Sequence, residues 1–194
     1  MGTSRLVAAR HGSTAWSATR QHTGLTDIPL DSEGVAEAVE LGRRLAGHDF
    51  RLVLTSPLQR AQSTSELCGF GDVAQVSDDL REWDYGEMEG RTTDEIRLEV
   101  PGWDIWKDGV TGGESVEDVV SRADRVISLV QSEPGDVLVF SHAHILRIIG
   151  ARWIGLPGSG GRMLTLSTAT LSVLGWERQT PAIIRWNDTT KDPL

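Results

Sequence analysis

Two histidines of this chain follow short apolar segments, where they could take part in covalent catalysis. His11 comes after the segment 6–9 and Arg10, and His142 comes after the segment 137–141. An imidazole can attack phosphorus when one ring nitrogen is unprotonated and the other is held as a donor. Because an open α/β sheet carries its chemistry at the carboxyl ends of its strands, this pair favours transfer of a phosphoryl group through a phosphohistidine.

Two arginines and one carboxylate could complete such a site. Arg10 directly precedes His11, and Arg60 lies one turn into a helix expected after the segment 52–55. Guanidinium groups bind phosphate oxygens in a bidentate way and keep their charge. Glu82 is the carboxyl placed to protonate a leaving oxygen. A helix beginning near Ala143 is expected to direct free backbone N–H groups at the same anion.

Simpler interpretations compete with these roles. A histidine at a strand end is more often structural than catalytic, and an arginine near a helix start is usually solvated or ion-paired. His142 and His144 could suggest a metal pair, but no carboxylate or cysteine set at ligand spacing accompanies them, so no metal is expected. His48 is expected to be structural, and His22 stays open as a residue of a pocket wall.

Size and composition exclude several classes of function. The chain has 194 residues, which suits a single domain over 1–194 with a sizeable core. Its net charge of −9 argues against binding of nucleic acid, so an anionic substrate would need a locally positive pocket. No apolar run is long enough for a membrane span or a signal peptide. The single cysteine, Cys68, fits a reducing compartment, and a cytoplasmic protein is expected.

Strand and helix patterns alternate along the chain and predict an α/β fold. Strands are expected at 6–9, 52–55, 73–76 and 137–141, and two antiparallel strands near 168–176 and 182–186. Helices are expected from Asp31 or Ser32, from Pro57, from the capping boxes at Thr92 and Ser115, and from about 144 to 153. The alternation predicts a three-layer α/β/α sandwich with a mostly parallel central sheet.

Finer features are also expected. The helix after Asp31 should direct one apolar stripe at the core, at helical spacing. This stripe consists of Val35, Ala38, Val39, Gly42 and Leu45. Pro57 should stand at the first position of its helix, and the segment 78–90 should be an irregular loop.

Five motifs, in order, resemble the histidine phosphatase superfamily, whose fold is phosphoglycerate-mutase-like. The motifs are Arg10-His11-Gly12-Ser13-Thr14, Ser56-Pro57-Leu58-x-Arg60-Ala61, Glu82-x-x-x-Gly86-x-x-Glu89-Gly90, Gly113-Glu114-Ser115 and Ser141-His142-Ala143. The resemblance extends from Leu6 to about Trp186. It implies a phosphorylated nucleophile at His11, a phosphate pocket of Arg10, Arg60 and His142, and a proton donor at Glu82. The positions it implies for the site lining are Ser17, Thr23, Gly24, Tyr85 and Ala143.

Three further segments, 21–27, 80–86 and 103–109, resemble a phosphatase branch of this superfamily. That branch includes fungal sedoheptulose-bisphosphatase-like enzymes and actinobacterial acid phosphatases. Ser13 and Ser17 depart from the family, since many relatives carry Glu at the first position and mutases usually carry Asn at the second. The resemblance therefore implies a metal-independent phosphomonoesterase for small esters, sugar phosphates foremost, with no cofactor and a possible homodimer.

Two alternatives remain open. A cofactor-dependent phosphoglycerate mutase shares the core, but mutases carry extra sequence after the glutamate segment and a C-terminal tail that covers the site. Here the stretch between Gly90 and Gly112 is short, and the tail after Asn187 is short and polar. The other alternative is a non-catalytic sensor of a phosphorylated ligand, against which the presence of His11 and Glu82 argues.

Overall fold

One six-stranded sheet organises residues 4–190 and 192–194, which the computed structural model describes. Its strands are β1 (Leu6–Arg10), β2 (Leu52–Thr55), β3 (Gln75–Val76), β4 (Val137–Ser141), β5 (Leu171–Glu177) and β6 (Thr180–Asp188). The spatial order is β3-β2-β4-β1-β5-β6, with β3, β2, β4 and β1 parallel and the hairpin of β5 and β6 antiparallel. The predicted mostly parallel sheet is confirmed.

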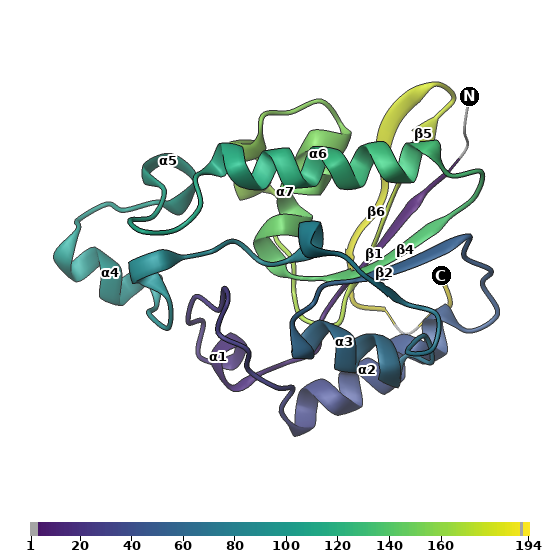
Figure 1. Cartoon of the computed structure of the whole chain (residues 1–194), viewed down its shortest axis with the longest axis horizontal. Coiled ribbons are helices and arrows are strands. Elements are labelled where there is room, and N and C mark those ends of the chain that lie inside the picture. The colour runs from purple at the N-terminus through teal and green to yellow at the C-terminus, as the bar shows by residue number, and fades with distance from the viewer. Residues whose placement is uncertain (1–3, 191) are drawn as a thin grey trace.

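Helices cover both faces of this sheet, as Figure 1 shows. α2 (Ser32–Leu45) and α3 (Gln59–Leu67) lie on one face, and α6 (Val116–Ser132) and α7 (Ala143–Trp153) lie on the other. Each face has its own apolar core. Val126 and Ile149 belong to the core under α6 and α7, and Leu41 and Phe140 belong to the core under α2. The three-layer α/β/α sandwich is therefore confirmed.

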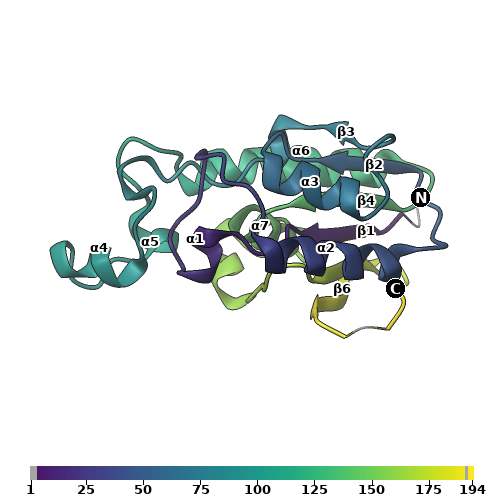
Figure 2. The same cartoon turned by 90° about the horizontal axis from the view of Figure 1, so that it is seen from below.

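Shorter elements extend past the carboxyl ends of the parallel strands. They are the helices α1 (Ala15–Ala18), α4 (Thr93–Glu99) and α5 (Ile105–Asp108), with the 3₁₀ turns η1 (Asp78–Leu80), η2 (Gly86–Met88) and η3 (Gly158–Met163). In Figure 2, α4 and α5 project well beyond the sheet, with α1 beside its end. The segment 78–90, expected to be irregular, contains η1 and η2.

Both predicted capping boxes are present. The Ser115 hydroxyl accepts the N–H of Asp118 at 3.2 Å, and the Asp118 carboxylate accepts the N–H of Ser115 at 2.9 Å. Thr92 and Glu95 exchange the same two bonds at the start of α4. Each box satisfies backbone donors that the first helical turn leaves free, and so fixes where its helix begins.

The start of α3 differs from the prediction, because Pro57 lies before the helix rather than at its first position. α3 begins at Gln59 with Leu58 as its N-cap, and Leu58 keeps an extended backbone. The Ser56 hydroxyl accepts the Leu58 N–H at 3.3 Å, and the Asp27 carboxylate accepts the Gln59 N–H at 2.8 Å. These side chains supply the caps that the helix would otherwise lack, two residues later than expected.

The inner face of α2 includes Ala38 and Leu45 of the expected stripe, but it is rotated away from Val35 and Val39. Val35 and Val39 are 42% and 38% exposed, whereas Leu41 is 1% exposed. The reason is the close approach of Gly34 to Ser13, where an added Cβ would lie 2.1 Å from the Ser13 carbonyl oxygen. Because this contact turns Gly34 inward, the buried face follows from it. That face consists of Gly34, Ala38, Leu41 and Leu45, with Arg44.

Substitutions on α2 test this rotation. We expect Leu41→Ala to lower the free energy of unfolding by about 2–5 kcal/mol, because it leaves a cavity in a packed core. Val35→Ala removes a partly solvated side chain of the same helix and should cost within about 1 kcal/mol. Urea denaturation measures both values. A larger loss for Val35→Ala than for Leu41→Ala would contradict the observed orientation.

No helix among the described residues is long and apolar enough to cross a membrane.

Candidate active site

The pairing of β1 with β4 places the two histidines side by side. The strands are parallel, and Arg10 pairs with Ser141, so His11 and His142 leave the sheet at the same level. The His11 N–H donates to the Ser141 carbonyl at 3.0 Å, and the two imidazole centroids are 5.1 Å apart. The register of β1 on β4 therefore places His11 next to His142, as we expected from the sequence.

His11 is held as a neutral imidazole with a defined tautomer. Its Nδ1 lies 2.7 Å from the carbonyl oxygen of Gly12, and because a carbonyl only accepts, Nδ1 carries the proton. Nε2 is then the nitrogen with a free lone pair. Burial, and after it the charges of Arg10 and Arg60, hold the pKa of His11 well below 6.5. The ring therefore has the form that a nucleophile needs.

Arg60 lies behind the two histidines and is fully buried. Its Nε donates to His142 Nδ1 at 3.1 Å, and its terminal nitrogens donate to the carbonyls of Thr23, Gly24 and Thr26 at 2.9–3.1 Å. Since His142 Nδ1 accepts, its Nε2 carries the proton and donates to the Ser56 hydroxyl at 2.7 Å. Burial first, and then Arg60, hold the pKa of His142 well below 6.5.

Arg10 approaches the site from the end of β1. Its Nη1 donates to the Leu166 carbonyl at 2.5 Å, and its buried Nε has no hydrogen-bond partner in the described part of the chain. A buried donor without a partner is costly unless a ligand supplies the acceptor. Arg10 therefore fits an anion bound beside His11.

Glu82 is fixed by backbone donors. Its Oε1 accepts the N–H groups of Trp83 at 3.0 Å and Ile145 at 3.1 Å, and its Oε2 accepts that of His144 at 3.0 Å. These bonds correct part of one expectation, because the N–H groups of His144 and Ile145, the second and third residues of α7, bind Glu82 rather than face an anion. Because Oε2 accepts only one hydrogen bond, it is the carboxyl oxygen that can carry a proton.

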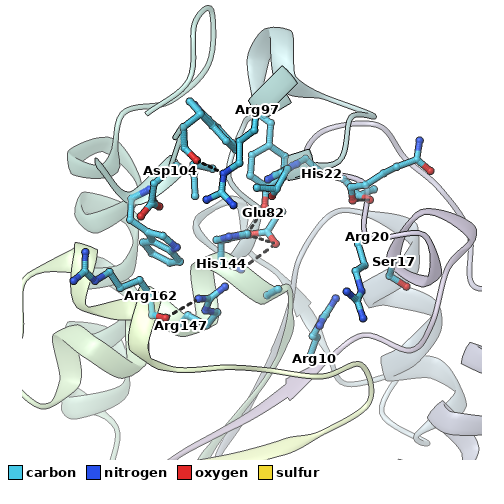
Figure 3. A pocket seen from close by; sticks show the side chains of 18 of the residues that line it. Arg10, Ser17, Arg20, His22, Glu82, Arg97, Asp104, His144, Arg147 and Arg162 are labelled. Carbon is cyan, nitrogen blue, oxygen red and sulfur yellow. Dashed lines mark hydrogen bonds and ion pairs between the residues drawn. The ribbon is translucent and has the colours of Figure 1, made fainter. Parts of the chain in front are cut away.

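These groups open into one cavity of about 680 Å³, a volume typical of small-molecule sites. Figure 3 shows Glu82 and His144 at its centre with Arg10 and Ser17 to one side. Of the predicted site residues, seven line this cavity. They are Arg10, His11, Ser17, Thr23, Glu82, Tyr85 and Ala143. His142, Arg60 and Gly24 are not part of its lining and lie behind it.

Two of the predicted lining positions act mainly within the protein. The Ser17 hydroxyl accepts the Thr14 N–H at 2.8 Å in the capping box of α1. Gly24 donates its N–H to Glu89 at 2.8 Å, and an added Cβ there would lie 2.6 Å from the Trp83 carbonyl oxygen. Glycine is therefore needed at position 24 for close packing rather than for contact with a ligand.

Several lining residues were not predicted from the sequence. They are Arg20, Arg97, Trp103, Asp104, Trp106, His144, Arg147 and Arg162, among others. Arg147 follows Ala143 by four residues on α7, a spacing that puts both on one helix face and could have indicated it. Arg97, Trp106 and Arg162 come from α4, α5 and η3, and Trp103 and Asp104 directly precede α5. Arg20 follows α1, and His144 lies on α7. The sequence did not indicate that these segments meet at the cavity.

Two histidines whose roles were left open also lie in the cavity wall. His144 Nδ1 and the Tyr85 hydroxyl are 2.6 Å apart, and burial raises the pKa of that phenol well above 10. His22 donates from Nδ1 to the Arg91 carbonyl at 2.8 Å and packs edge-on against Tyr85. Burial lowers the pKa of both histidines, so both imidazoles are neutral near pH 7.

The described residues contain no group of three or more His, Cys, Asp or Glu side chains arranged to hold a metal ion. The positive charge of the site comes from its arginines.

Comparison with known proteins identifies the family. The model of the histidine phosphatase superfamily (branch 1) matches residues 6–189. The chain belongs to the histidine phosphatase superfamily. An acid phosphatase of Mycobacterium tuberculosis is 40% identical over 178 residues, which cover 89% of this chain and 87% of that protein. The sedoheptulose 1,7-bisphosphatase of Saccharomyces cerevisiae is 35% identical, covering 79% and 69%. The chain is a phosphatase of this superfamily, and the resemblance read from its motifs is confirmed.

Solved structures of the superfamily share the fold. The structure of the Mycobacterium tuberculosis open reading frame Rv3214 superposes with a TM-score of 0.89 at 36% identity, covering 95% of this chain and 97% of that one. A mycobacterial glucosyl-3-phosphoglycerate phosphatase gives a TM-score of 0.85 at 28% identity, covering 96% and 100%. A protein of Salmonella choleraesuis named as a probable phosphoglycerate mutase is 29% identical, covering 89% and 85%.

The lowered pKa of His11 predicts the acidic limit of activity. His11 stays neutral down to its lowered pKa, so the acidic limb of kcat/KM should lie well below pH 6.5. Arg60→Gln removes one of the charges that disfavour protonation and should move this limb to higher pH by up to roughly one unit. Burial remains in the variant, so the limb should stay below 6.5.

The measurement compares both proteins on one substrate, so that titration of the substrate phosphate cancels. Arg152→Gln is the control, because Arg152 pairs with Asp124 at 2.9 Å away from the cavity. An unchanged acidic limb in Arg60→Gln would show that the arginine charge does not set the protonation of His11.

Proposed function

We propose that this phosphatase hydrolyses small phosphate monoesters, sugar phosphates foremost, through a phosphohistidine on His11. The observation that carries the proposal is His11 itself, a buried neutral imidazole whose Nδ1 is bonded to Gly12 and whose Nε2 is left free beside a cavity. The names of the relatives support a sugar phosphate as the substrate, since these relatives include a sedoheptulose bisphosphatase and a glucosyl-3-phosphoglycerate phosphatase.

In the first step, His11 Nε2 attacks phosphorus in line with the ester oxygen. The N–P bond forms as the P–O bond to the leaving group breaks. Arg10 binds the phosphate oxygens and stabilises the charge that they gain. Arg60 is already bonded to three carbonyls and to His142, so it contributes chiefly through its charge. Glu82 donates a proton from Oε2 to the leaving alkoxide.

In the second step, water attacks the phosphohistidine. Glu82, now a carboxylate, takes a proton from the water as the N–P bond breaks. His11 returns to its neutral form and inorganic phosphate leaves. The backbone N–H groups of Trp83, His144 and Ile145 hold the Glu82 carboxyl in one place through both steps. This fixed position allows one residue to act as acid and then as base.

We further propose that the reaction needs no metal ion and takes place in the cytoplasm. The arginines of the site supply the charge that a divalent cation would bring.

The single cysteine, Cys68, supports the cytoplasmic location, because one cysteine cannot form a disulfide within the chain. Cys68 is buried, and burial raises its pKa to about 12, which leaves the thiol unreactive. The net charge of −9 favours a small-molecule partner over a nucleic acid.

Replacing the nucleophile tests the covalent step. We expect His11→Ala to lower kcat by at least about 10³-fold, because no other group can form the intermediate. The wild-type protein, mixed with substrate and denatured at alkaline pH, should carry one phosphoryl group on His11 in peptide mass spectra. Near-wild-type turnover by a folded His11→Ala protein would exclude the mechanism.

The role of Glu82 is tested by the leaving group. General acid catalysis is commonly worth about 10²–10⁴-fold. We therefore expect Glu82→Gln to slow an alkyl phosphate by about that factor and p-nitrophenyl phosphate far less, because a phenolate leaves without a proton. Equal losses on the two esters would make Glu82 a positioning residue instead of a proton donor.

A mutase is the second candidate, because a relative 29% identical is named as one. We expect release of inorganic phosphate from 3-phosphoglycerate or sugar phosphates in EDTA, without a bisphosphoglycerate primer. Nuclear magnetic resonance of phosphorus follows hydrolysis and isomerisation in the same sample. Isomerisation much faster than any hydrolysis would establish the mutase, and binding without turnover would establish a sensor.

A further inference from the structure

The segment that carries Glu82 has no regular backbone structure of its own. Residues 81–85 lie between η1 and η2 and belong to no helix or strand. The N–H groups of Trp83, His144 and Ile145 hold the carboxyl group of Glu82, but the main chain on either side needs partners of its own. In a buried irregular segment, side chains must supply many of these partners. The position of Glu82 therefore depends on the residues that bind this segment.

One arginine of α6 binds the main chain before Glu82. Arg122 Nη1 donates to the carbonyls of Asp79 at 3.0 Å and Arg81 at 2.9 Å. Its Nη2 donates to the Glu82 carbonyl at the longer distance of 3.5 Å, and Nε and Nη2 donate to the two carboxylate oxygens of Glu114, both at 2.8 Å. These five bonds use all five N–H groups of the guanidinium. No other side chain offers this set of donors.

Glu114 binds the main chain after Glu82. Its Oε2 accepts the Asp84 N–H at 3.0 Å, and its own N–H donates to the Asp84 carbonyl at 3.0 Å. Its carbonyl accepts the indole N–H of Trp83 at 2.8 Å. The segment is thus bound by Arg122 on one side of Glu82 and by Glu114 on the other. Because two charged bonds join these side chains to each other, they hold both sides of the segment as one unit.

The motif Gly113-Glu114-Ser115 places this pair against the segment. An added Cβ at Gly113 would lie 2.2 Å from the Asp84 carbonyl oxygen, so only glycine allows the close approach of the two chains. Ser115 is the N-cap of α6 and fixes where that helix begins. Arg122 follows about two turns later, on the face of α6 that points back to Glu114. Each residue of the motif therefore has a part in binding the segment of Glu82.

Stability alone gives no reason for an ion pair at this place. The Arg122 side chain is 7% exposed, so its charge has lost most of its hydration. The loss of hydration offsets much of the attraction in such a pair, and apolar side chains of similar volume often stabilise a fold equally well. What the pair supplies is direction, because guanidinium and carboxylate groups bond in one plane with fixed geometry. It therefore restricts the segment 81–84 more strictly than apolar packing would.

We propose that Glu114 and Arg122 are positioning residues that hold Glu82 where it can protonate the leaving oxygen. This inference rests on the proposed function, because it assumes that Glu82 is the proton donor. The two residues lie behind the cavity lining and act through the main chain of 81–84. A displacement of about 1 Å at a catalytic group can cost on the order of 100-fold in rate. Loosening the pair should therefore weaken proton donation and leave the binding of phosphate by Arg10 intact.

Glu114→Gln and Arg122→Lys test the pair with two esters, fructose 6-phosphate and p-nitrophenyl phosphate. Gln keeps the size of the side chain without its charge, and Lys keeps the charge without the planar set of donors. The quantity measured is kcat/KM, which excludes the later hydrolysis of the phosphohistidine. We expect each variant to lower it roughly 10- to 100-fold for fructose 6-phosphate. The loss for p-nitrophenyl phosphate should be far smaller, because a phenolate leaves without a proton. The ratio of the two values does not depend on the fraction of folded protein.

Arg125→Gln is the matched control. Arg125 lies on the same helix as Arg122 and pairs with Asp79 at 2.6 Å, but it does so at the surface, where its side chain is 58% exposed. This variant should keep the wild-type ratio of the two esters. A ratio lowered as much as in Arg122→Lys would show that any arginine bound near this segment has the same effect, and would overturn the assignment.

Combination with Glu82→Gln shows whether the pair acts through Glu82. Once Glu82 can no longer donate a proton, adding Glu114→Gln should lower the ratio no further. A further fall in the double variant would reveal another route and overturn the inference.

The remaining outcomes separate this inference from the proposed function. Equal losses on both esters in Glu114→Gln and Arg122→Lys, beside a lowered ratio in Glu82→Gln, would overturn the positioning role and leave the phosphatase mechanism standing. An unchanged ratio in Glu82→Gln would contradict the proposed role of Glu82 itself, and the inference would fail with it.

Discussion

The parallel register of β1 on β4 is the constraint on which the site depends. It puts His11 beside His142, and the next pairing, of β2 with β4, brings Ser56 within 2.7 Å of His142. A slip of one residue would turn each side chain to the other face of the sheet and separate the pair. Gly12 completes the arrangement, because an added Cβ would lie 2.3 Å from the Gly34 carbonyl oxygen. The backbone geometry of the sheet therefore fixes the positions of these site residues.

One electrostatic arrangement then serves two purposes. Burial and the charges of Arg10 and Arg60 keep His11 neutral, and the same charges attract the phosphate that His11 attacks. Burying Arg60 is costly, but its bonds to His142 and to the carbonyls of the loop 23–26 offset that cost. These bonds also set the tautomer of His142. Nucleophile, cation and supporting loop therefore form one hydrogen-bonded unit rather than separate residues.

The sequence was enough to predict the residues that follow strands, because parallel strands end at one edge. His11, Arg10 and Glu82 line the cavity as expected, with His142 and Arg60 just behind it. The orientation of α2 was not predictable from apolar spacing, since the contact between Gly34 and the Ser13 backbone sets it. Arg97 was missed for a different reason, because it reaches the cavity from α4 and only the folded chain brings that helix to the cavity. Arg147 was also missed, although its four-residue spacing from Ala143 on α7 could have indicated it.

The protonation state of His11 is the centre of this account, and nitrogen nuclear magnetic resonance of the imidazole side chains observes it directly. The chain has five histidines, so His11→Gln assigns the signal by its disappearance. At pH 6 in the absence of substrate, His11 should be neutral with its proton on Nδ1, whereas the neutral ring of His142 should carry its proton on Nε2. A His11 ring that is doubly protonated at pH 6, or protonated on Nε2 alone, would contradict the account, because no lone pair would then face the phosphate.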